Sequence, residues 1–303
     1  MYDIVIIGGG PAGLTAALYA KRYGMDILVL ESAIYGGQVT NTPEVENYPG
    51  IKSIAGADFA FQLYEQIVNL GVEIRLEGVE QVDFTGPVKV IKTIKDTYEA
   101  RTVIIANGAK RRKLLCVGEA ELTGKGVSYC ATCDGAFFKG KDVAIVGGGN
   151  TALEDALFLA NNCRTVHLIH RRDAFRGNKI LSDAVVAREN IHIHYDSVVD
   201  EIYGHAKVEG IVLRNVKNDQ TQDLPLAGVF VAVGLEPDNK LLAGQVELDR
   251  AGYIVAGEDC KTSLAGVYAA GDTRTKELRQ IITAAADGAV AAFEASNLIN
   301  AGA

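Results

Sequence analysis

The feature that most constrains this chain is a glycine-rich segment that occurs twice. Residues 3–31 read DIVIIGGGPAGLTAALYAKRYGMDILVLE, and residues 142–172 read DVAIVGGGNTALEDALFLANNCRTVHLIHRR. Each copy has the pattern of a short apolar strand, three glycines, an amphipathic helix and a second apolar strand. Because the copies are too far apart for a solenoid repeat, they predict two related α/β domains, each with a Rossmann-like dinucleotide-binding fold.

The glycines of both copies follow the dinucleotide-binding fingerprint. They are Gly8, Gly10 and Gly13 in the first copy, and Gly147, Gly149 and Ala152 in the second. The first glycine makes the sharp turn, the second lets the backbone approach a pyrophosphate, and the third small residue lets the helix pack closely on the strand. The start of that helix supplies amides and a partial positive charge. One such match is a weak signal, but two in the same context indicate two nucleotide sites.

The residue that ends the second strand of each copy predicts which nucleotide binds. In the first copy it is Glu31, whose carboxylate can accept from ribose hydroxyls and would repel a 2′-phosphate. In the second copy it is His170, followed by Arg171 and Arg172, with Arg176 one helical turn further on. Guanidinium groups bind phosphate, so the second site is predicted to take NADPH. A solvated basic face is the alternative interpretation of this second cluster.

Further repetition predicts how the domains are arranged. A strand-rich stretch precedes a buried strand that ends in glycine in both halves, at residues 100–110 and 226–239, which indicates a small antiparallel meander in each domain. A last strand and an alanine-rich helix follow residue 244. If they complete the first domain, the second is an insertion. The predicted domains are therefore residues 1–113 with 245–303, and residues 114–244.

Composition excludes several classes of protein. The 303 residues carry a net charge of −8 with a pI near 5.2, which argues against a nucleic-acid partner. The sequence shows neither a secretory leader nor an apolar run of about 20 residues, the length that spans a bilayer. Its five cysteines are odd in number and mostly scattered, so they do not form a secreted disulfide framework, and a cytoplasmic location is expected.

Two of those cysteines are three residues apart, Cys130 and Cys133, shortly before the second glycine turn. Such a pair occurs as half of a zinc site, as a redox pair, or by chance. A zinc site needs about four ligands. Cys163 and His167 could supply a second pair, but they are expected on the end of a helix and on the next strand. No metal site is therefore predicted.

The chain resembles the low-molecular-weight bacterial thioredoxin reductases nearly from end to end. The segments GGGPAG, GGQVTNTPEVENYPG, CATCDG, GGGNTA, HRRDAFR and GVYAAGD…RQIITAAADG follow the order found in that family. CATCDG is the most specific of them, because other flavin disulfide reductases carry their cysteines in the first domain.

The resemblance implies FAD in the first site, NADPH in the second, and a homodimer. Besides the fingerprint residues already named, it implies cofactor contacts from the residues that follow in each motif. In the first domain these are Pro11, Ala12, Gly36, Gly37, Gln38, Asn47, Gly271, Asp272, Arg279, Gln280 and Ile281; in the second they are Asn150 and Thr151. Asp272 would hold the ribityl chain, and residues 279–281 would bring a helix N-terminus near the flavin ring.

The resemblance also implies the reaction. Electrons pass from NADPH through FAD to the Cys130–Cys133 disulfide, and the dithiol reduces a thioredoxin or thioredoxin-like protein by disulfide exchange. Cys133 would face the flavin and Cys130 would attack the partner. Asp134 is placed to move a proton, although it could simply be a turn residue. Phe137 and Phe138 either contact the partner or belong to the core. Because the cysteines belong to the NADPH domain, a rotation of that domain is implied.

Three rival functions are weighed against this one. A ferredoxin-dependent flavoprotein or a flavin thiol oxidase of the same fold would not need the arginine cluster. A catalytically silent nucleotide sensor would have no reason to keep the Cys-x-x-C pair beside Asp134. Which thioredoxin-like partner is served does not follow from the sequence, nor do the roles of Cys116, Cys163 and Cys260.

Overall fold

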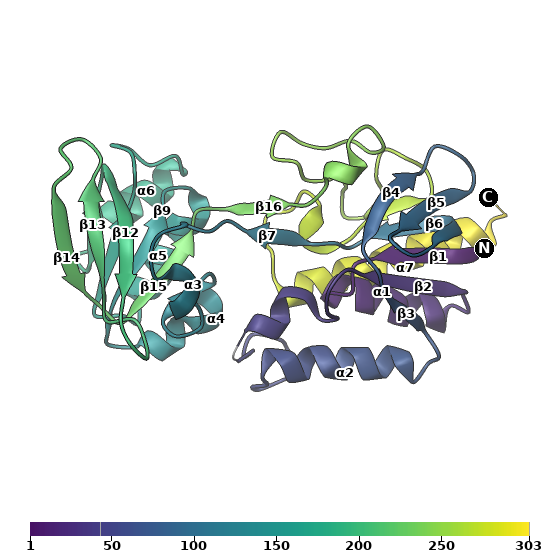
Figure 1. Ribbon diagram of the computed structural model, residues 1–303, viewed down its shortest axis with the longest axis horizontal. Helices are drawn as coiled ribbons and strands as arrows, with labels where there is room; N and C mark the ends of the chain where they lie inside the picture. Colours follow the sequence, from purple (N-terminus) through teal and green to yellow (C-terminus); the bar gives the residue numbers. More distant parts are fainter. Residues whose placement is uncertain (43, 303) are drawn as a thin grey trace. The chain divides into compact units, whose positions relative to one another are not determined.

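The computed structural model describes residues 1–42 and 44–302. The chain forms two compact units (Figure 1). Unit 1 consists of Met1–Lys110 and Glu236–Ala303, and unit 2 of Arg111–Leu235. Both ends of the chain belong to unit 1, so unit 2 is an insertion. The predicted fold class, two Rossmann-like domains with the second inserted in the first, is confirmed.

Unit 1 is built on one mixed sheet with the order β3-β2-β1-β6-β5-β4, in which β17 also pairs with β6. Its strands are β1 (Tyr2–Ile7), β2 (Ile27–Glu31), β3 (Glu73–Leu76), β4 (Val79–Asp83), β5 (Lys89–Thr93), β6 (Thr97–Ile105) and β17 (Val267–Ala269). The long strand β6 serves two parts of the sheet. Its first half pairs antiparallel with β5 in the predicted meander, and its second half pairs parallel with β17, while β1 runs parallel on its other side.

The two faces of this sheet are covered differently. Its helices are α1 (Pro11–Arg22), α2 (Gly56–Val68) and α7 (Ile281–Asn300), with the short turns η1 (Gly37–Asn41), η3 (Lys240–Leu242) and η4 (Gly271–Thr273). Ile4, Ile6 and Ile104 point toward α1 and α7, whose small alanines let the two helices pack closely. Val5 and Val103 point to the other face, against the meander. Alternate strand residues thus bury both faces, which explains why these strands are apolar throughout.

Unit 2 has a five-stranded parallel sheet, β11-β10-β9-β15-β8, and a separate antiparallel sheet, β12-β13-β14. The strands are β8 (Val127–Ser128), β9 (Asp142–Gly147), β10 (Thr165–Ile169), β11 (Ile191–His194), β12 (Ser197–Tyr203), β13 (Gly210–Asn215), β14 (Thr221–Pro225) and β15 (Gly228–Ala232). The helices are α3 (Glu119–Leu122), α4 (Ala131–Asp134), η2 (Gly135–Phe138), α5 (Asn150–Ala160) and α6 (Lys179–Val186). Helices α5 and α6 cover one face of the parallel sheet and the antiparallel sheet covers the other.

The parallel part of the unit 1 sheet and the parallel sheet of unit 2 share one strand order. In each, the strand that leads into the glycine turn, β1 or β9, is central. The next two strands of the chain lie on one side of it, β2 and β3 or β10 and β11. A later strand, β6 or β15, lies on the other side. On that side, the position of the next parallel strand is filled from different parts of the chain. In unit 1 it is filled by β17, near the end of the chain, whereas in unit 2 it is filled by β8, which precedes the glycine turn.

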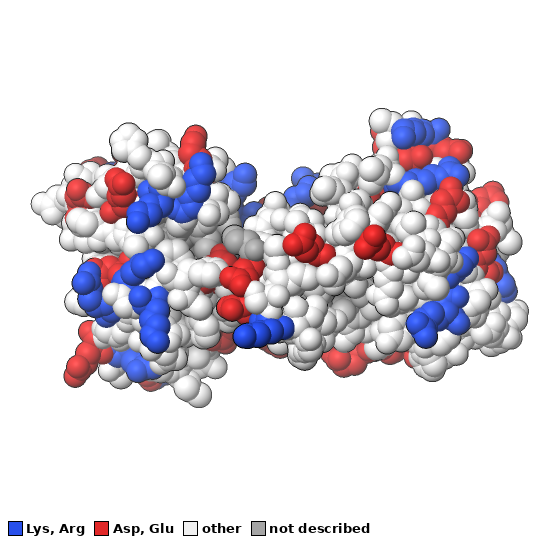
Figure 2. Space-filling view, turned by 90° about the horizontal axis from the view of Figure 1, so that it is seen from below, with Lys and Arg blue, Asp and Glu red and all other residues white. Residues whose placement is uncertain are grey.

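The chain passes between the units twice, and the two passing segments pair with each other. They are β7 (Ala109–Arg111) and β16 (Leu235–Pro237), which form a two-stranded sheet. No helix among the described residues is long and apolar enough to cross a membrane. On the face seen in Figure 2, basic and acidic residues are interspersed on both units.

Candidate nucleotide and redox sites

The first glycine turn joins β1 to α1 in unit 1. Gly8 has a φ of +111°, and a Cβ on Gly13 would lie 1.8 Å from the carbonyl oxygen of Gly8, so both positions exclude a side chain. Gly10 differs, because a Cβ there would meet nothing within 4 Å. The first turn of α1 begins at Pro11, with neither a side-chain cap nor an acidic residue. Its amides therefore border an open space, and free amides at a helix N-terminus favour an anion such as a phosphate.

The carboxylate of Glu31 lies beside this turn, at the end of β2. One oxygen accepts from the backbone N–H of Gly9 at 2.7 Å, and the other accepts from the backbone N–H of Ala33 at 2.9 Å. The side chain is thus fixed next to the open space at Gly10. The structure brings Glu31 and the glycine turn together, as a site for the ribose and pyrophosphate of a dinucleotide requires.

Segments far apart in the sequence meet at the start of α7. Asn47 donates its side-chain amide to the Gln280 oxygen at 3.0 Å. Gln280 is the N-cap of α7 and forms a capping box with Thr283. Gln38 in η1 donates to the carbonyl of Ala109. Asn47 and the N-terminus of α7 are therefore held in one region of unit 1, to which Gln38 also belongs.

The other residues expected at this site lie on either side of the α7 cap. Gly271 and Asp272 form η4, and Asp272 is half-buried. The Arg279 guanidinium stacks over the Tyr253 ring at 4.2 Å. Ile281 begins α7 directly after the Gln280 cap.

A buried ion cluster next to η4 was not predicted from the sequence. Asp287 of α7 binds the Arg274 guanidinium through both oxygens at 2.8 Å, and Lys276 at 2.7 Å. It also accepts from the backbone N–H of Gly271 at 2.8 Å. Burial acts to raise the pKa of Asp287, but the hydrogen bonds from Arg274 and Lys276 outweigh it and the pKa is lowered. No local pattern in the sequence indicates the cluster, because Asp287 lies 13 residues after Arg274 and 11 after Lys276.

The second glycine turn shares the close packing and the open middle glycine of the first, although Gly147 lacks the positive φ of Gly8. Gly147 and Ala152 pack so closely that a Cβ on Gly147 would lie 2.6 Å from that of Ala152. A Cβ on Gly149 would meet nothing within 4 Å, and α5 begins at Asn150 with neither a side-chain cap nor an acidic residue in its first turn. Thr151 is exposed in that turn. An open space therefore borders the N-terminus of α5, as another borders the N-terminus of α1.

Residues 170–178, which carry Arg171, Arg172 and Arg176, are held at this turn by backbone hydrogen bonds. The Gly148 carbonyl accepts from the N–H groups of Arg176 and Gly177, at 2.8 and 3.2 Å. The Asn150 side chain accepts from the N–H of Asn178 at 2.7 Å, where α6 is about to begin. The side chains of Arg171, Arg172 and Arg176 are exposed, and they make no hydrogen bond or ion pair with the part of the chain that the structure describes.

Two details of the predicted arginine cluster need correction. Residues 170–178 form a loop, not a helix, so the expected helical spacing of Arg176 was wrong. His170 is buried, with 4% of its surface exposed, and its ring packs where a Cβ on Gly148 would lie. Its Nε2 donates to the carbonyl of Ala174 at 3.0 Å. Burial foremost, with the charges of Arg176 and Arg172, lowers the pKa of His170, so the ring adds no positive charge near neutral pH.

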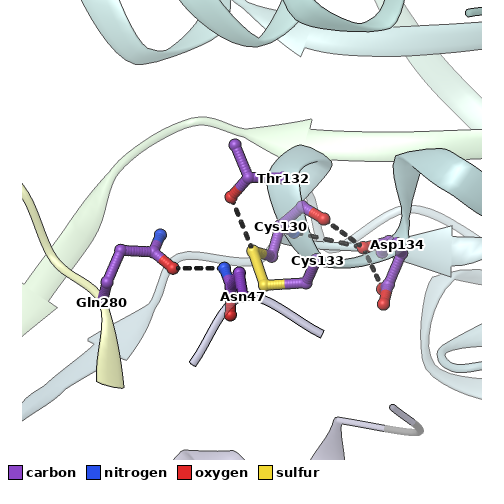
Figure 3. Close-up of a disulfide and its surroundings, with 7 residues drawn as sticks. Asn47, Cys130, Thr132, Cys133, Asp134 and Gln280 are labelled. Carbon is purple, nitrogen blue, oxygen red and sulfur yellow. Dashed lines mark hydrogen bonds between the residues drawn. A yellow bond between two sulfur atoms is a disulfide. The ribbon is translucent and has the colours of Figure 1, made fainter. Parts of the chain in front are cut away.

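Cys130 and Cys133 form a disulfide at the start of α4, directly after β8 (Figure 3). Cys130 is the N-cap of this single turn, and the Cα atoms of the two cysteines are 5.3 Å apart. The Cys130 sulfur contacts the Thr132 hydroxyl at 3.5 Å. The predicted pair is therefore a redox-capable disulfide, and among the described residues no group of His, Cys, Asp or Glu could hold a metal ion.

Asp134, the last residue of α4, is half-buried next to the disulfide (Figure 3). Its Oδ2 accepts from the Ser128 hydroxyl at 2.5 Å. Burial raises the pKa of this carboxyl, and the Ser128 hydrogen bond and the Arg111 charge oppose the rise only in part. A carboxyl with a raised pKa beside a disulfide is suited to donate a proton to a departing thiolate.

Glu119 is a second residue that sequence reasoning missed. It has 2% of its surface exposed, and it accepts from the backbone N–H groups of Leu114 and Leu115 at 2.9 and 2.8 Å. It also accepts from the Tyr129 hydroxyl at 2.7 Å. Burial foremost, then this bond, raises the pKa of Tyr129 to about 12. Glu119 thereby joins the segment that enters unit 2 to the residue that precedes Cys130.

The remaining cysteines and the two phenylalanines are sorted by burial. Cys163 and Cys260 are buried free thiols and Cys116 is a half-buried one. Phe138 packs against Phe230 in the core with ring centroids 5.2 Å apart, whereas Phe137 is exposed. Each of the two alternatives, core residue or partner contact, therefore applies to one phenylalanine. Phe138 is a core residue, and Phe137 is available for a partner.

Comparison with known proteins identifies the family of the chain. Residues 2–288 match the pyridine nucleotide-disulphide oxidoreductase family, and the chain belongs to that family. Membership implies a flavin and a nicotinamide nucleotide, and the open space at Gly10 and at Gly149, each before an uncapped helix N-terminus, fits two such nucleotides.

Within the family, the chain is similar to thioredoxin reductases over its whole length. It is 46% identical to thioredoxin reductase of Mycolicibacterium smegmatis, covering 97% of this chain and 96% of that one. It is 43% identical to thioredoxin reductase of Peptoclostridium litorale, covering 99% and 97%. The crystal structure of thioredoxin reductase from Streptococcus pyogenes matches with a TM-score of 0.93 at 42% identity, covering 99% of both chains.

Proposed function

We propose that this protein is an NADPH-dependent, FAD-containing thioredoxin-disulfide reductase. The observation that carries the proposal is the Cys130–Cys133 disulfide beside the half-buried Asp134, in the same unit as a dinucleotide turn bordered by three exposed arginines. A chain of this family with an intact disulfide, an acid, a flavin site and a nicotinamide site has the groups that disulfide reduction needs. Its similarity to thioredoxin reductases supports thioredoxin or a thioredoxin-like protein as the acceptor.

Each cofactor is assigned to one unit by charge. We place FAD on unit 1, where Glu31 would accept from the hydroxyls of an unphosphorylated ribose, and NADPH on unit 2, where Arg171 and Arg172 would bind a 2′-phosphate. His170 supports the arginine loop from beneath through Ala174. When bound, the nicotinamide and the flavin carry two electrons to the protein disulfide.

The residues of the chain carry out the exchange that follows. Reduced Cys130, as a thiolate, attacks one sulfur of the partner's disulfide; a mixed disulfide forms and the partner's other sulfur leaves. Cys133 then attacks Cys130, which breaks the mixed disulfide, releases the second partner thiolate and restores the Cys130–Cys133 bond. Asp134 supplies a proton to a departing thiolate, and Phe137 is positioned to contact the partner.

Three further properties belong to this proposal. The nicotinamide site and the disulfide both lie on unit 2, yet both must reach one flavin on unit 1, so we infer a rotation of unit 2 during turnover. We infer a homodimer, supported by the exposed aromatic cluster of Tyr19, Tyr23 and Phe293 on unit 1. The scattered free thiols support a cytoplasmic location.

Anaerobic titration tests the proposal as a whole. Purified protein reconstituted with FAD should be bleached by NADPH, and oxidised thioredoxin should restore the flavin absorbance. Cys130→Ser and Cys133→Ser should each abolish thioredoxin reduction while the bound flavin stays reducible by NADPH. Folded protein that retains no FAD, or reduced protein that thioredoxin does not reoxidise, would refute the assignment.

The same titration separates the rival functions. Bleaching by reduced ferredoxin but not by NADPH would indicate a ferredoxin-dependent reductase. Rapid reoxidation by oxygen, with thioredoxin inert, would indicate a thiol oxidase. The exposed arginines favour the NADPH outcome, because neither rival needs to bind a 2′-phosphate.

A further inference from the structure

The hydroxyl of Ser128 joins the redox disulfide to Asp134. Ser128 ends β8 with 6% of its surface exposed, and its Oγ lies 3.1 Å from the backbone nitrogen of Cys130 and 2.5 Å from Asp134 Oδ2. Because a backbone N–H can only donate, Ser128 accepts from Cys130. Its own hydrogen is then available to Asp134 Oδ2, with the Cys130 carbonyl at 3.3 Å as the weaker alternative.

The two oxygens of Asp134 are therefore not equivalent. Oδ2 receives the Ser128 hydrogen bond, whereas Oδ1 is buried and makes no hydrogen bond with any residue that the structure describes. A hydrogen bond received at one carboxyl oxygen favours placing the proton on the other. A neutral Asp134 would carry its proton on Oδ1.

The surroundings of Asp134 contain few other groups that could set its protonation. Arg111, from the segment that enters unit 2, is the nearby charge, and its attraction favours the carboxylate. On the side of α5, Phe158 and Leu159 pack against the neighbouring Gly135. Burial raises the pKa of Asp134, and the Ser128 bond and the Arg111 charge lower it. Loss of the Ser128 hydroxyl would therefore move the pKa further upward.

We propose that Ser128 is a positioning residue that holds Oδ2 of Asp134, so that Oδ1 is the oxygen that gives its proton to the departing thiolate. The inference rests on the proposed disulfide-reductase function. As the bond between Cys130 and the partner sulfur breaks, its electron pair leaves with that sulfur, which takes the Oδ1 proton. The resulting carboxylate keeps the Ser128 hydrogen bond and later regains a proton from water.

A double-mutant cycle on the FAD-loaded enzyme tests this role. The variants are Ser128→Ala, Asp134→Asn, the double variant, and Ser128→Thr, which keeps the hydroxyl. Each enzyme is first reduced by NADPH, which also reports folding, and is then mixed with disulfides in a stopped-flow instrument. General acid catalysis typically contributes about 10²–10⁴-fold, so we expect Ser128→Ala to slow thioredoxin reduction about tenfold and Ser128→Thr to restore most of the rate.

Two features of the result separate positioning from plain structural support. Ser128→Ala should move the basic limb of the pH profile to higher pH and cause no further slowing in the Asp134→Asn background. Equal slowing with and without Asp134, or no slowing at all, would overturn the proposal.

Two small disulfides keep this test separate from the choice of protein partner. Cystamine releases an aliphatic thiolate that needs a proton and should show the effect of Ser128→Ala. An aromatic disulfide, whose thiolate leaves without a proton, should not. If thioredoxin is inert but the variants reduce cystamine at the rates that the double-mutant cycle predicts, the proposed partner is wrong and the role of Ser128 stands. Slowing of both small disulfides alike would count against that role.

Discussion

At the scale of single residues, Arg171 and Arg172 are expected to determine the choice of coenzyme. Each charge-assisted hydrogen bond to a 2′-phosphate contributes about 1.5–3 kcal/mol. Replacing both arginines with glutamine should therefore raise the KM for NADPH by roughly tenfold or more, with little change for NADH. The measurement is kcat/KM for the two coenzymes.

Arg164→Gln provides the matched control for this prediction. Arg164 is an exposed arginine of the same unit and is paired with Asp142. Its replacement by glutamine should therefore leave the preference for NADPH over NADH unchanged. An equal loss with NADPH and NADH in the double variant would contradict a phosphate-binding role.

His170 shows where residue-level prediction from sequence reaches its limit. The strand–turn–helix pattern located the end of β10 to within one residue, at His170 instead of Ile169, and with it the basic segment. It could not show that His170 is buried against Gly148 while Arg171 and Arg172 are exposed. That difference depends on the hydrogen bonds of the loop to the glycine turn. Asp134 was identified, but its Ser128 partner was not, because a serine two residues before a cysteine carries no pattern.

Asp287 is predicted to be the residue on which the stability of unit 1 most depends. Removing one partner of a buried ion cluster typically costs about 3–5 kcal/mol, because the other charges stay buried. Asp287→Asn should therefore lower the melting temperature strongly and loosen FAD. The exposed Asp259, paired with Lys261, provides the control: Asp259→Asn should cost about 1 kcal/mol or less.

The lowered pKa of Asp287 also predicts a pH dependence. A carboxyl whose pKa is lower in the folded state stabilises the protein fully above its ordinary pKa, and that stability is lost as the pH falls through the lowered value. Wild-type protein should lose melting temperature on acidification, and the Asp287→Asn variant should lose less. Parallel acid curves for the two proteins would contradict the prediction.

At the scale of elements, the short helix α3 is expected to hold the redox loop through Glu119. Hydrogen bonds to a charged group contribute about 1.5–3 kcal/mol, and Glu119 accepts three in a buried position. Glu119→Gln can keep only part of them, so it should lower the unfolding temperature of unit 2 and slow thioredoxin reduction. Glu121→Gln, on the exposed side of the same helix, is the control and should do neither.

The sequence predicted those elements whose residue pattern is strong and missed those without one. The glycine turns, both meanders and α7 follow from periodicity and turn residues. β8 does not, because two residues are too short for any pattern, and its pairing with β15 comes from a contact across a hundred residues of sequence. The same holds for the meeting of Asn47 and Gln280, which no local signal encodes.

At the scale of the whole molecule, the paired segments β7 and β16 are the only covalent route between the units, among described residues. Each is preceded by a glycine in the left-handed region: Gly108 has a φ of +68° and Gly234 a φ of +106°. A Cβ on Gly108 would meet nothing within 4 Å, and one on Gly234 would only reach Arg112 at 4.0 Å. Alanine at either position would therefore restrict the backbone without a clash.

If unit 2 rotates during turnover, Gly108→Ala and Gly234→Ala should slow it. A residue other than glycine in this region costs about 1–2 kcal/mol, so multiple-turnover thioredoxin reduction should fall several-fold while NADPH binding stays unchanged. Gly71→Ala and Gly140→Ala are matched controls. Both glycines have a positive φ and open space, but Gly71 lies within unit 1 and Gly140 within unit 2, away from the connecting segments. They should lose similar stability and keep their turnover. Undiminished turnover in the Gly108 and Gly234 variants, or an equal loss in all four, would show that rotation does not use these glycines.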